Sequence, residues 1–232
     1  MSKLMNYLTS SIGRKYLTGI TGIGLVLFTI VHLLGNLNLF IGQDSFNLYT
    51  YKLESLGPLL EVAEIGLAIC FLLHAIVGVS VYLNKKKARP IDYYVYNSAG
   101  GNSKQNFSSK SMMVTGSIIL IFLVIHVATF KFGPSIEQGY VTNINGVDMR
   151  DLYRLVVEKF KQLPIVIVYT IVMILLGTHL RHGFWSAFQS LGLLNKKYRP
   201  FVYTLGILVA VMLSIGFLIL PIWVYFFVEM GA

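Results

Sequence analysis

The sequence predicts an all-α membrane protein in which five transmembrane helices form a bundle, and three observations predict this class. Of the 232 residues, 55% are hydrophobic and only 12% are charged, whereas a soluble domain carries about 25% charged residues. Five long apolar runs follow one another along the chain, and a helix that crosses the hydrocarbon core needs about 20 such residues. Helices are expected because lipid offers no partners for unsatisfied backbone groups.

The five predicted spans cover 16–35, 59–83, 111–132, 164–185 and 201–227. The first is predicted to stay uncleaved, because its apolar run is too long for a signal peptide and has no small-residue cleavage site after it. No internal sequence repeat is evident, so residues 1–232 are predicted to form a single domain. Cys70 is the single cysteine of the chain, which excludes a disulfide framework and covalent haem attachment through a C-x-x-C-H motif.

The basic residues lie mainly on one side of the predicted membrane. They are Lys3, Arg14 and Lys15 before the first span; Lys85, Lys86, Lys87, Arg89, Lys104 and Lys110 between the second and third; and Lys196, Lys197 and Arg199 between the fourth and fifth. The other connections carry charges of both signs. The positive-inside rule therefore predicts a cytoplasmic N-terminus. Topology explains the net charge of +9, and no nucleic-acid partner is expected.

Two segments on the predicted outer side have helical periodicity. In VDMRDLYRLVVEKFKQLP, residues 147–164, apolar side chains recur every three to four positions, with Asp148 as the expected N-cap. A similar spacing occurs in DSFNLYTYKLESLG, residues 44–57. Two interpretations stay open for both: helices lying on the membrane surface, or ordinary structured loops. On the inner side, NSAGGNSKQNFSSKS, residues 97–111, is predicted to be a polar, flexible linker.

The histidines all fall inside the predicted spans, although ionisable groups at membrane depth are costly and usually functional. The first four spans contain His32, His74, His126 and His179, and the fourth also contains His182. The first four histidines each lie about three-quarters of the way along their spans. Because neighbouring spans run in opposite directions, His32 and His126 are predicted near the outer face and His74 and His179 near the inner face. At about 1.5 Å per residue, the two levels are on the order of 15–20 Å apart.

Two histidine pairs at two depths are the donor sets that two bis-histidine haems b require. Glycines could let a flat macrocycle enter between the helices, and the alternative at each position is close helix packing. These glycines are Gly19, Gly22, Gly24, Gly66, Gly78, Gly116 and Gly177. A zinc or non-haem iron centre fits less well, because it would need histidines and carboxylates at one depth. The fold class is thus refined to a five-helix bundle that binds two haems b between its helices.

This pattern resembles the di-haem cytochrome b membrane anchor of succinate dehydrogenase and fumarate reductase, respiratory complex II. Three features carry the resemblance: the distribution of histidines over the spans, the LESLGPLLEVAEI and LLHAIVGV stretches of the second span, and HLRHGFWSAFQSLG in the fourth. The last stretch is similar to the H-x-x-[HN]-G-x-W-S segment of that family. The resemblance covers nearly the whole chain.

The resemblance implies a function in electron transfer. A flavoprotein subunit and an iron–sulfur subunit would dock on the cytoplasmic face of a bacterial inner membrane. Electrons would pass between the iron–sulfur subunit, the inner haem of His74 and His179, the outer haem of His32 and His126, and a quinone. A di-haem anchor resembles the family members that work with menaquinone, so the resemblance implies menaquinone as the quinone. No catalytic residue for dicarboxylate chemistry is expected in this chain, because that chemistry belongs to the flavoprotein.

Two further groups of residues are expected near these cofactors. His182 and Arg181 are predicted to contact haem propionates. The alternative for His182 is that it, and not His179, ligates the inner haem, and the alternative for Arg181 is a snorkelling interfacial role. For the quinone, the candidates are Glu54, Glu61 and Glu64, because quinone chemistry needs a nearby proton donor or acceptor. Depth within the span favours Glu64. Helix capping near the N-terminus of the second span is the alternative role for these acids.

Two other functions remain as alternatives. One is a di-haem cytochrome b anchor of another respiratory oxidoreductase, which would co-purify with different partner subunits. The other is a transporter that uses the histidines as a proton relay, which predicts no visible absorption and favours half-helices or inverted repeats.

Overall fold

The computed structural model describes residues 10–88 and 107–229. Five long helices dominate it: α2 (Ser11–Asn36), α4 (Pro58–Lys87), α5 (Phe107–Phe130), α7 (Leu163–Ser190) and α8 (Arg199–Phe227). All five are long and apolar enough to cross a membrane. Each predicted span falls on one of them, which confirms the all-α, multi-pass class. Residues 107–111, expected to belong to a flexible linker, begin α5, and the rest of that predicted linker lies outside the described residues.

The ends of the long helices follow from local sequence. Ser10 caps α2, because its hydroxyl accepts a hydrogen bond from the Gly13 backbone N–H at 3.0 Å. Proline lies in the first turn of α4, α7 and α8, where its missing N–H has no helical partner to lose. The last turn of α4 carries Lys85, Lys86 and Lys87, a position where the helix dipole favours cations.

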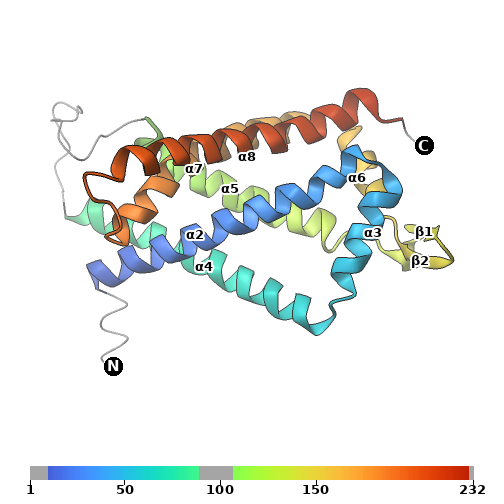
Figure 1. Cartoon of the computed structure of the whole chain (residues 1–232), viewed down its shortest axis with the longest axis horizontal. Helices are drawn as coiled ribbons and strands as arrows, with labels where there is room; N and C mark the ends of the chain where they lie inside the picture. Colours follow the sequence, from blue (N-terminus) through green and yellow to red (C-terminus); the bar gives the residue numbers. More distant parts are fainter. Residues whose placement is uncertain (1–9, 89–106, 230–232) are drawn as a thin grey trace.

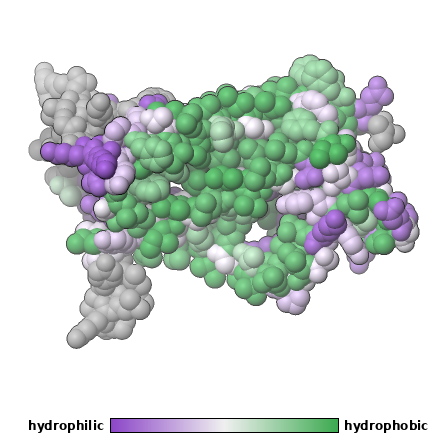
Figure 2. Space-filling view, viewed as in Figure 1, coloured by the Kyte–Doolittle hydropathy of each residue, from purple (hydrophilic) through white to green (hydrophobic). Residues whose placement is uncertain are grey.

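Consecutive long helices run in opposite directions, so the bundle has two ends (Figure 1). We call the end where α2 begins the N-side, and the opposite end the hairpin side. α7 packs against α8, α5 and α2, whereas α4 lies at the edge of the bundle against α2 and, over a shorter length, α5. The surface between the two ends is predominantly apolar, and hydrophilic residues gather at both ends (Figure 2). This distribution is typical of a protein embedded in lipid.

The hairpin side carries a small cap of short elements. These are η1 (Leu37–Phe40), α3 (Gln43–Glu54), η2 (Ile136–Gln138), β1 (Val141–Ile144), β2 (Val147–Arg150) and α6 (Leu152–Phe160). The two strands pair antiparallel with Ile144 opposite Val147. Asn145 and Gly146 turn the chain with φ of 55° and 82°, as a two-residue hairpin turn requires. This β-hairpin was not predicted, although the Asn-Gly dipeptide signals it.

The helices α3 and α6 confirm the two predicted helical segments, and both pack against protein. Phe46 of α3 joins Val156 and Phe160 of α6 in a buried cluster with residues of α7 and α8. The predicted N-cap of the second segment is wrong. Asp148 lies in strand β2, and Asp151 caps α6 by accepting a hydrogen bond from the Arg154 backbone N–H at 3.0 Å. The strand pairing fixes residues 147–150 in extended backbone, so the helix begins later.

Asp151 also joins the two cap helices. Its buried carboxylate accepts hydrogen bonds from Gln43 Nε2 at 2.9 Å and from Asn47 Nδ2 at 2.8 Å. Asn47 in turn accepts from the Tyr153 backbone N–H at 2.9 Å. Buried polar groups are stable when every partner is satisfied, and this network fixes α3 against α6 over the end of the bundle.

Candidate functional site

The histidines lie on four helices at two levels, as the spacing predicted. On the hairpin side, His32 of α2 and His126 of α5 face each other. Their ring centroids are 5.9 Å apart, with an angle of 87° between the ring planes. Aromatic rings surround this pair: Phe28 and Phe217 lie within 5.7 Å of His32, and Phe122 and Phe130 within 5.6 Å of His126, measured between ring centroids. The environment of the pair is therefore largely apolar.

His74 and His179 form the second level, closer to the N-side. The His74 Nδ1 lies 3.2 Å from Thr21 Oγ1 of α2, and the His179 Nδ1 lies 3.0 Å from Thr115 Oγ1 of α5. Each imidazole packs on a glycine that follows the threonine. A Cβ atom at Gly22 would lie 3.3 Å from the His74 ring, and one at Gly116 would lie 3.2 Å from the His179 ring. Both distances are shorter than most Cβ contacts, so a side chain at either glycine would push the imidazole outward by a few tenths of an ångström.

Two helix pairs therefore repeat one arrangement, although the sequence shows no overall repeat. In α2 and in α5, a Thr-Gly dipeptide receives the histidine of the next long helix, and a histidine follows about 11 residues later. At about 1.5 Å per residue, that separation puts the two levels on the order of 16 Å apart along both helices. This value falls within the predicted range.

Each of the four histidines has a polar neighbour at Nδ1. The Tyr169 hydroxyl lies 3.0 Å from His126 Nδ1, and the Asn36 amide nitrogen lies 3.5 Å from His32 Nδ1. In metal-binding histidines, a partner on one ring nitrogen fixes the tautomer and orients the other nitrogen toward the metal. For His74, His179 and His126, whose neighbour is a hydroxyl that can accept from Nδ1–H, the arrangement suits Nε2 as the ligand atom. The Asn36 amide nitrogen can only donate and forms its shorter bond, at 2.8 Å, with the His32 carbonyl, so it does not select Nε2 of His32 in this way.

The spacing of the hairpin-side pair, His32 and His126, fits two axial ligands of one haem. Bonds between imidazole nitrogen and a metal such as zinc are about 2 Å long, so two imidazoles that share one metal atom have ring centroids on the order of 6 Å apart. The 5.9 Å between His32 and His126 agrees with this distance. All four rings are half-buried. Within residues 10–88 and 107–229, no three metal-ligating side chains form one cluster, so the donor sets on offer are pairs.

The residues predicted to contact propionates lie near the N-side level but point differently. His182 is half-buried, interacts electrostatically with His179, and has its ring centroid 6.2 Å from that of Trp185. Arg181 is exposed, and its guanidinium donates to the Tyr203 hydroxyl of α8 at 3.4 Å. A propionate contact by either residue stays a prediction.

The three acids predicted near a quinone occupy different places on the hairpin side. Glu64, the least exposed of the three, forms an ion pair at 2.5 Å with Lys131, which lies just beyond the end of α5. The side chains of this pair are 40% and 47% exposed, respectively. Glu61 lies exposed in the first turn of α4, and Glu54 is the last residue of α3. The structure does not test a quinone contact by any of them.

Arg150 connects the cap to the helix that carries His126. Its guanidinium donates to the backbone carbonyls of Phe130, at 2.9 Å, and Pro134, at 2.9 Å. Phe130 is the last residue of α5, so Arg150 satisfies a carbonyl that the helix end leaves without a partner. Burial lowers the pKa of Arg150, and the Glu54 carboxylate opposes that shift. The cap thus fixes the end of α5 four residues after His126.

The other glycines divide between two surroundings. A Cβ atom at Gly19, Gly24 or Gly177 would meet a neighbouring helix, whereas one at Gly66 or Gly78 would meet nothing within 4 Å. The first three therefore favour the close-packing interpretation. Gly66 and Gly78 lie on α4, the helix at the edge of the bundle.

Comparisons of the chain with protein-family models, with curated proteins and with solved structures found no match. The site is therefore argued from its own geometry.

Sequence reasoning missed several residues that the structure places beside the predicted ligands. Thr21, Thr115 and Tyr169 hold histidine rings, and Lys131 pairs with Glu64. The Thr-Gly dipeptides at matching distances before His32 and His126 are a signal that could have identified the two threonines. Tyr169 carries no such signal, because an aromatic residue in a span is usually part of the packing.

Proposed function

We propose that this chain is the di-haem cytochrome b membrane anchor of a succinate dehydrogenase or fumarate reductase complex. It would carry electrons between an iron–sulfur subunit and a membrane quinone. The observation that carries the proposal is the repeated arrangement of the histidines: two pairs at two levels, each Nδ1 beside a polar neighbour. The resemblance of the second and fourth spans to that family supports the particular complex.

The histidines have the main role in this proposal. His74 and His179 hold the inner haem b, and His32 and His126 hold the outer one. Bound in this way, haem supplies one-electron transfer, and its potential depends on axial ligands, hydrogen bonds and burial. Thr21, Thr115 and Tyr169 keep the rings in one orientation. Gly22 and Gly116 let the inner histidines lie against the neighbouring helices.

The two ends of the bundle have different partners. The N-side is cytoplasmic, in a bacterial inner membrane, because its connections carry the excess of lysine and arginine. The flavoprotein and iron–sulfur subunits dock there. The quinone, proposed to be menaquinone, reacts on the hairpin side, where Glu64 and Lys131 offer groups that exchange protons. His182 and Arg181 are proposed as neighbours of the inner haem's propionates.

The test is a haem count on the purified chain together with the subunits that co-purify with it. We expect two non-covalent haems b per chain in a pyridine haemochrome assay. We also expect absorption that succinate reduces when flavin and iron–sulfur chains are present. One haem per chain would mean that one of the pairs is wrong. No haem in a folded preparation would favour the proton-relay transporter, and co-purification with a different oxidoreductase would favour the other class of anchor.

A further inference from the structure

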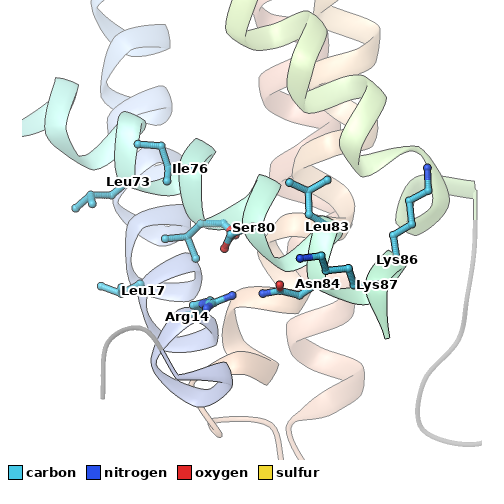
Figure 3. A pocket seen from close by; sticks show the side chains of 10 residues that line it. Arg14, Leu17, Leu73, Ile76, Ser80, Leu83, Asn84, Lys86 and Lys87 are labelled. Carbon is cyan, nitrogen blue, oxygen red and sulfur yellow. The ribbon is translucent and has the colours of Figure 1, made fainter. Parts of the chain in front are cut away.

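A groove between α2 and α4 opens on the N-side, outside the histidine pairs. It encloses about 800 Å³ and is drawn in Figure 3. From α2 it is lined by Arg14 and Leu17, and from α4 by Leu73, Ile76, Val77, Ser80, Leu83, Asn84, Lys86 and Lys87. Its volume is within the range of pockets that bind small molecules, which is about 300–1,000 Å³.

The groove has two chemically different parts. Leucine, isoleucine and valine side chains form its walls toward the middle of the bundle. At the N-side end, the polar ends of Arg14, Asn84 and Lys87 gather in one place, with the Ser80 hydroxyl nearby, while Lys86 is directed away (Figure 3). Among residues 10–88 and 107–229, no acidic side chain is part of this lining. An apolar channel that ends in cations, at the depth where an apolar helix ends, matches a lipid with a negatively charged headgroup.

The groove faces outward from the bundle. Ile76 is 63% exposed and Leu83 is 53% exposed. His74 follows Leu73 directly in the sequence, but its ring contacts Thr21 and Gly22 of α2 and is not part of the lining. The groove is thus open to surrounding lipid and separate from the side of α4 that carries the proposed haem ligand.

A second hollow on the N-side is basic too, but it lacks the apolar walls of the groove between α2 and α4. It encloses about 480 Å³ between α2 and the end of α7, and its lining includes Lys15, Ser186, Gln189 and Ser190. Only Ile12 and Tyr16 give it apolar surface from large side chains. Arg14 and Lys15 are therefore adjacent in sequence but line different hollows, and only the hollow of Arg14 has walls that suit acyl chains.

We propose that the groove between α2 and α4 binds one anionic glycerophospholipid, with its phosphate at Arg14 and Lys87 and an acyl chain along Leu73 and Ile76. Basic residues near a membrane surface each contribute about fivefold to binding of anionic lipid, and Arg and Lys are the side chains that bind phosphate oxygens. The proposal does not depend on the haems.

The experiment is native mass spectrometry of the full chain in mild detergent. Phosphatidylglycerol is titrated against phosphatidylcholine with the same acyl chains. The wild type is expected to bind one phosphatidylglycerol in clear preference. The double variant Arg14→Gln/Lys87→Gln is expected to bind it about 25-fold more weakly, with little change for phosphatidylcholine. The matched control Lys15→Gln/Lys85→Gln removes two neighbouring cations outside the groove and is expected to weaken phosphatidylglycerol binding much less than the double variant does, because neither lysine reaches the proposed phosphate position.

Two further variants keep the test decisive. Lys87→Gln alone, at the surface of the N-side, is expected to weaken phosphatidylglycerol binding about fivefold, and it replaces the double variant if that protein fails to fold. Ile76→Trp narrows the apolar part and is expected to weaken both lipids. Equal losses in the double variant and its control would show diffuse charge attraction and overturn the proposal. Equal affinity of the wild type for both lipids would overturn it too.

Discussion

The two helices that carry the inner histidines, α4 and α7, make the same kind of contact with the preceding long helix, but their surroundings differ. Both place a histidine on a Thr-Gly dipeptide of the preceding long helix. In the most apolar part of α7, 22% of residues are buried inside the protein, against 6% in α4. α7 is enclosed by α5, α2 and α8, while α4 forms an edge. α7 is therefore held by neighbours on several sides, whereas α4 has protein mainly on one side.

Replacement of the histidines is expected to give the largest effect. His74→Ala and His179→Ala should each remove the proposed inner haem, and His32→Ala and His126→Ala the outer one, because a bis-histidine site cannot keep its geometry with one ligand. Pyridine haemochrome counts should fall from two to about one per chain in every case. His182→Ala serves as the control and should keep both. Loss of both haems in His74→Ala alone would mean that α4 supports the two levels together.

Substitutions that crowd the inner histidines should destabilise the α5–α7 half of the arrangement more than the α2–α4 half. Gly116→Leu is expected to lower the free energy of unfolding by about 3 kcal/mol and Gly22→Leu by about 1 kcal/mol, because an overpacked edge helix can move outward. Thermal unfolding followed by circular dichroism measures both. Gly66→Leu is the control, since a Cβ at Gly66 meets nothing within 4 Å. Equal destabilisation by the first two variants would show that α4 is held as firmly as α7.

Replacement of Thr115 should weaken haem binding more than replacement of Thr21, for a related reason. Thr115→Val removes the hydroxyl beside His179 Nδ1 and is expected to weaken binding of the inner haem about 10–100-fold. Thr21→Val should have a smaller effect, because α4 lies at the edge of the bundle and the His74 ring can readjust there. Transfer of haem to an excess of apomyoglobin gives the loss rates. Thr29→Val is the control, because Thr29 donates only within its own helix, to the Leu25 carbonyl. A larger effect of Thr21→Val would contradict the prediction.

Tyr169 and Glu64 lie at matching places, about ten residues before the histidines of α7 and α4, respectively. Tyr169→Phe removes the partner of His126 Nδ1. Loss of about 1 kcal/mol of hydrogen bonding should raise the potential of the outer haem by about 40 mV, since that bond makes the ligand more basic. Potentiometric titration measures this shift.

Glu64→Gln, the matched change in the first half, should leave the potential of the outer haem unchanged, because Glu64 pairs with Lys131 and not with a histidine. An exposed ion pair contributes about 0–1 kcal/mol. A shift in both variants would indicate that Glu64 acts on the haem through α5.

The smallest expected effect is an acid-induced loosening of the cap. The Tyr140 hydroxyl and then the Arg154 guanidinium hold the pKa of the Glu158 carboxyl below its usual range. This contribution to stability is present above the unfolded pKa, near 4.3, and is lost as the pH falls below it. Hydrogen exchange of the hairpin and α6 should therefore quicken, relative to α4, as the pH falls from about 4.5 to about 3. In Glu158→Gln the extra acid sensitivity should be absent, and its persistence would assign the effect to another group.

Much of the architecture is determined by the sequence alone. Length and hydropathy located the five long helices, and periodicity located α3 and α6. The two histidine levels followed from counting residues, because an α-helix rises by a constant distance per residue. These features depend on one segment at a time. The Asn145-Gly146 turn could also have been predicted from its own dipeptide. Its hairpin was missed because the segment that begins at residue 147 was assigned to a helix.

Only the tertiary structure decided which side chains meet across helices. Such contacts depend on how each helix is rotated about its axis and on which helices are neighbours, and hydropathy fixes neither. Thr115 and Tyr169 became partners of His179 and His126 because α5 and α7 pack face to face. Asp151, and not Asp148, caps α6 because the strand pairing extends to Arg150. The open position of α4, with its groove beside α2, follows from the same packing.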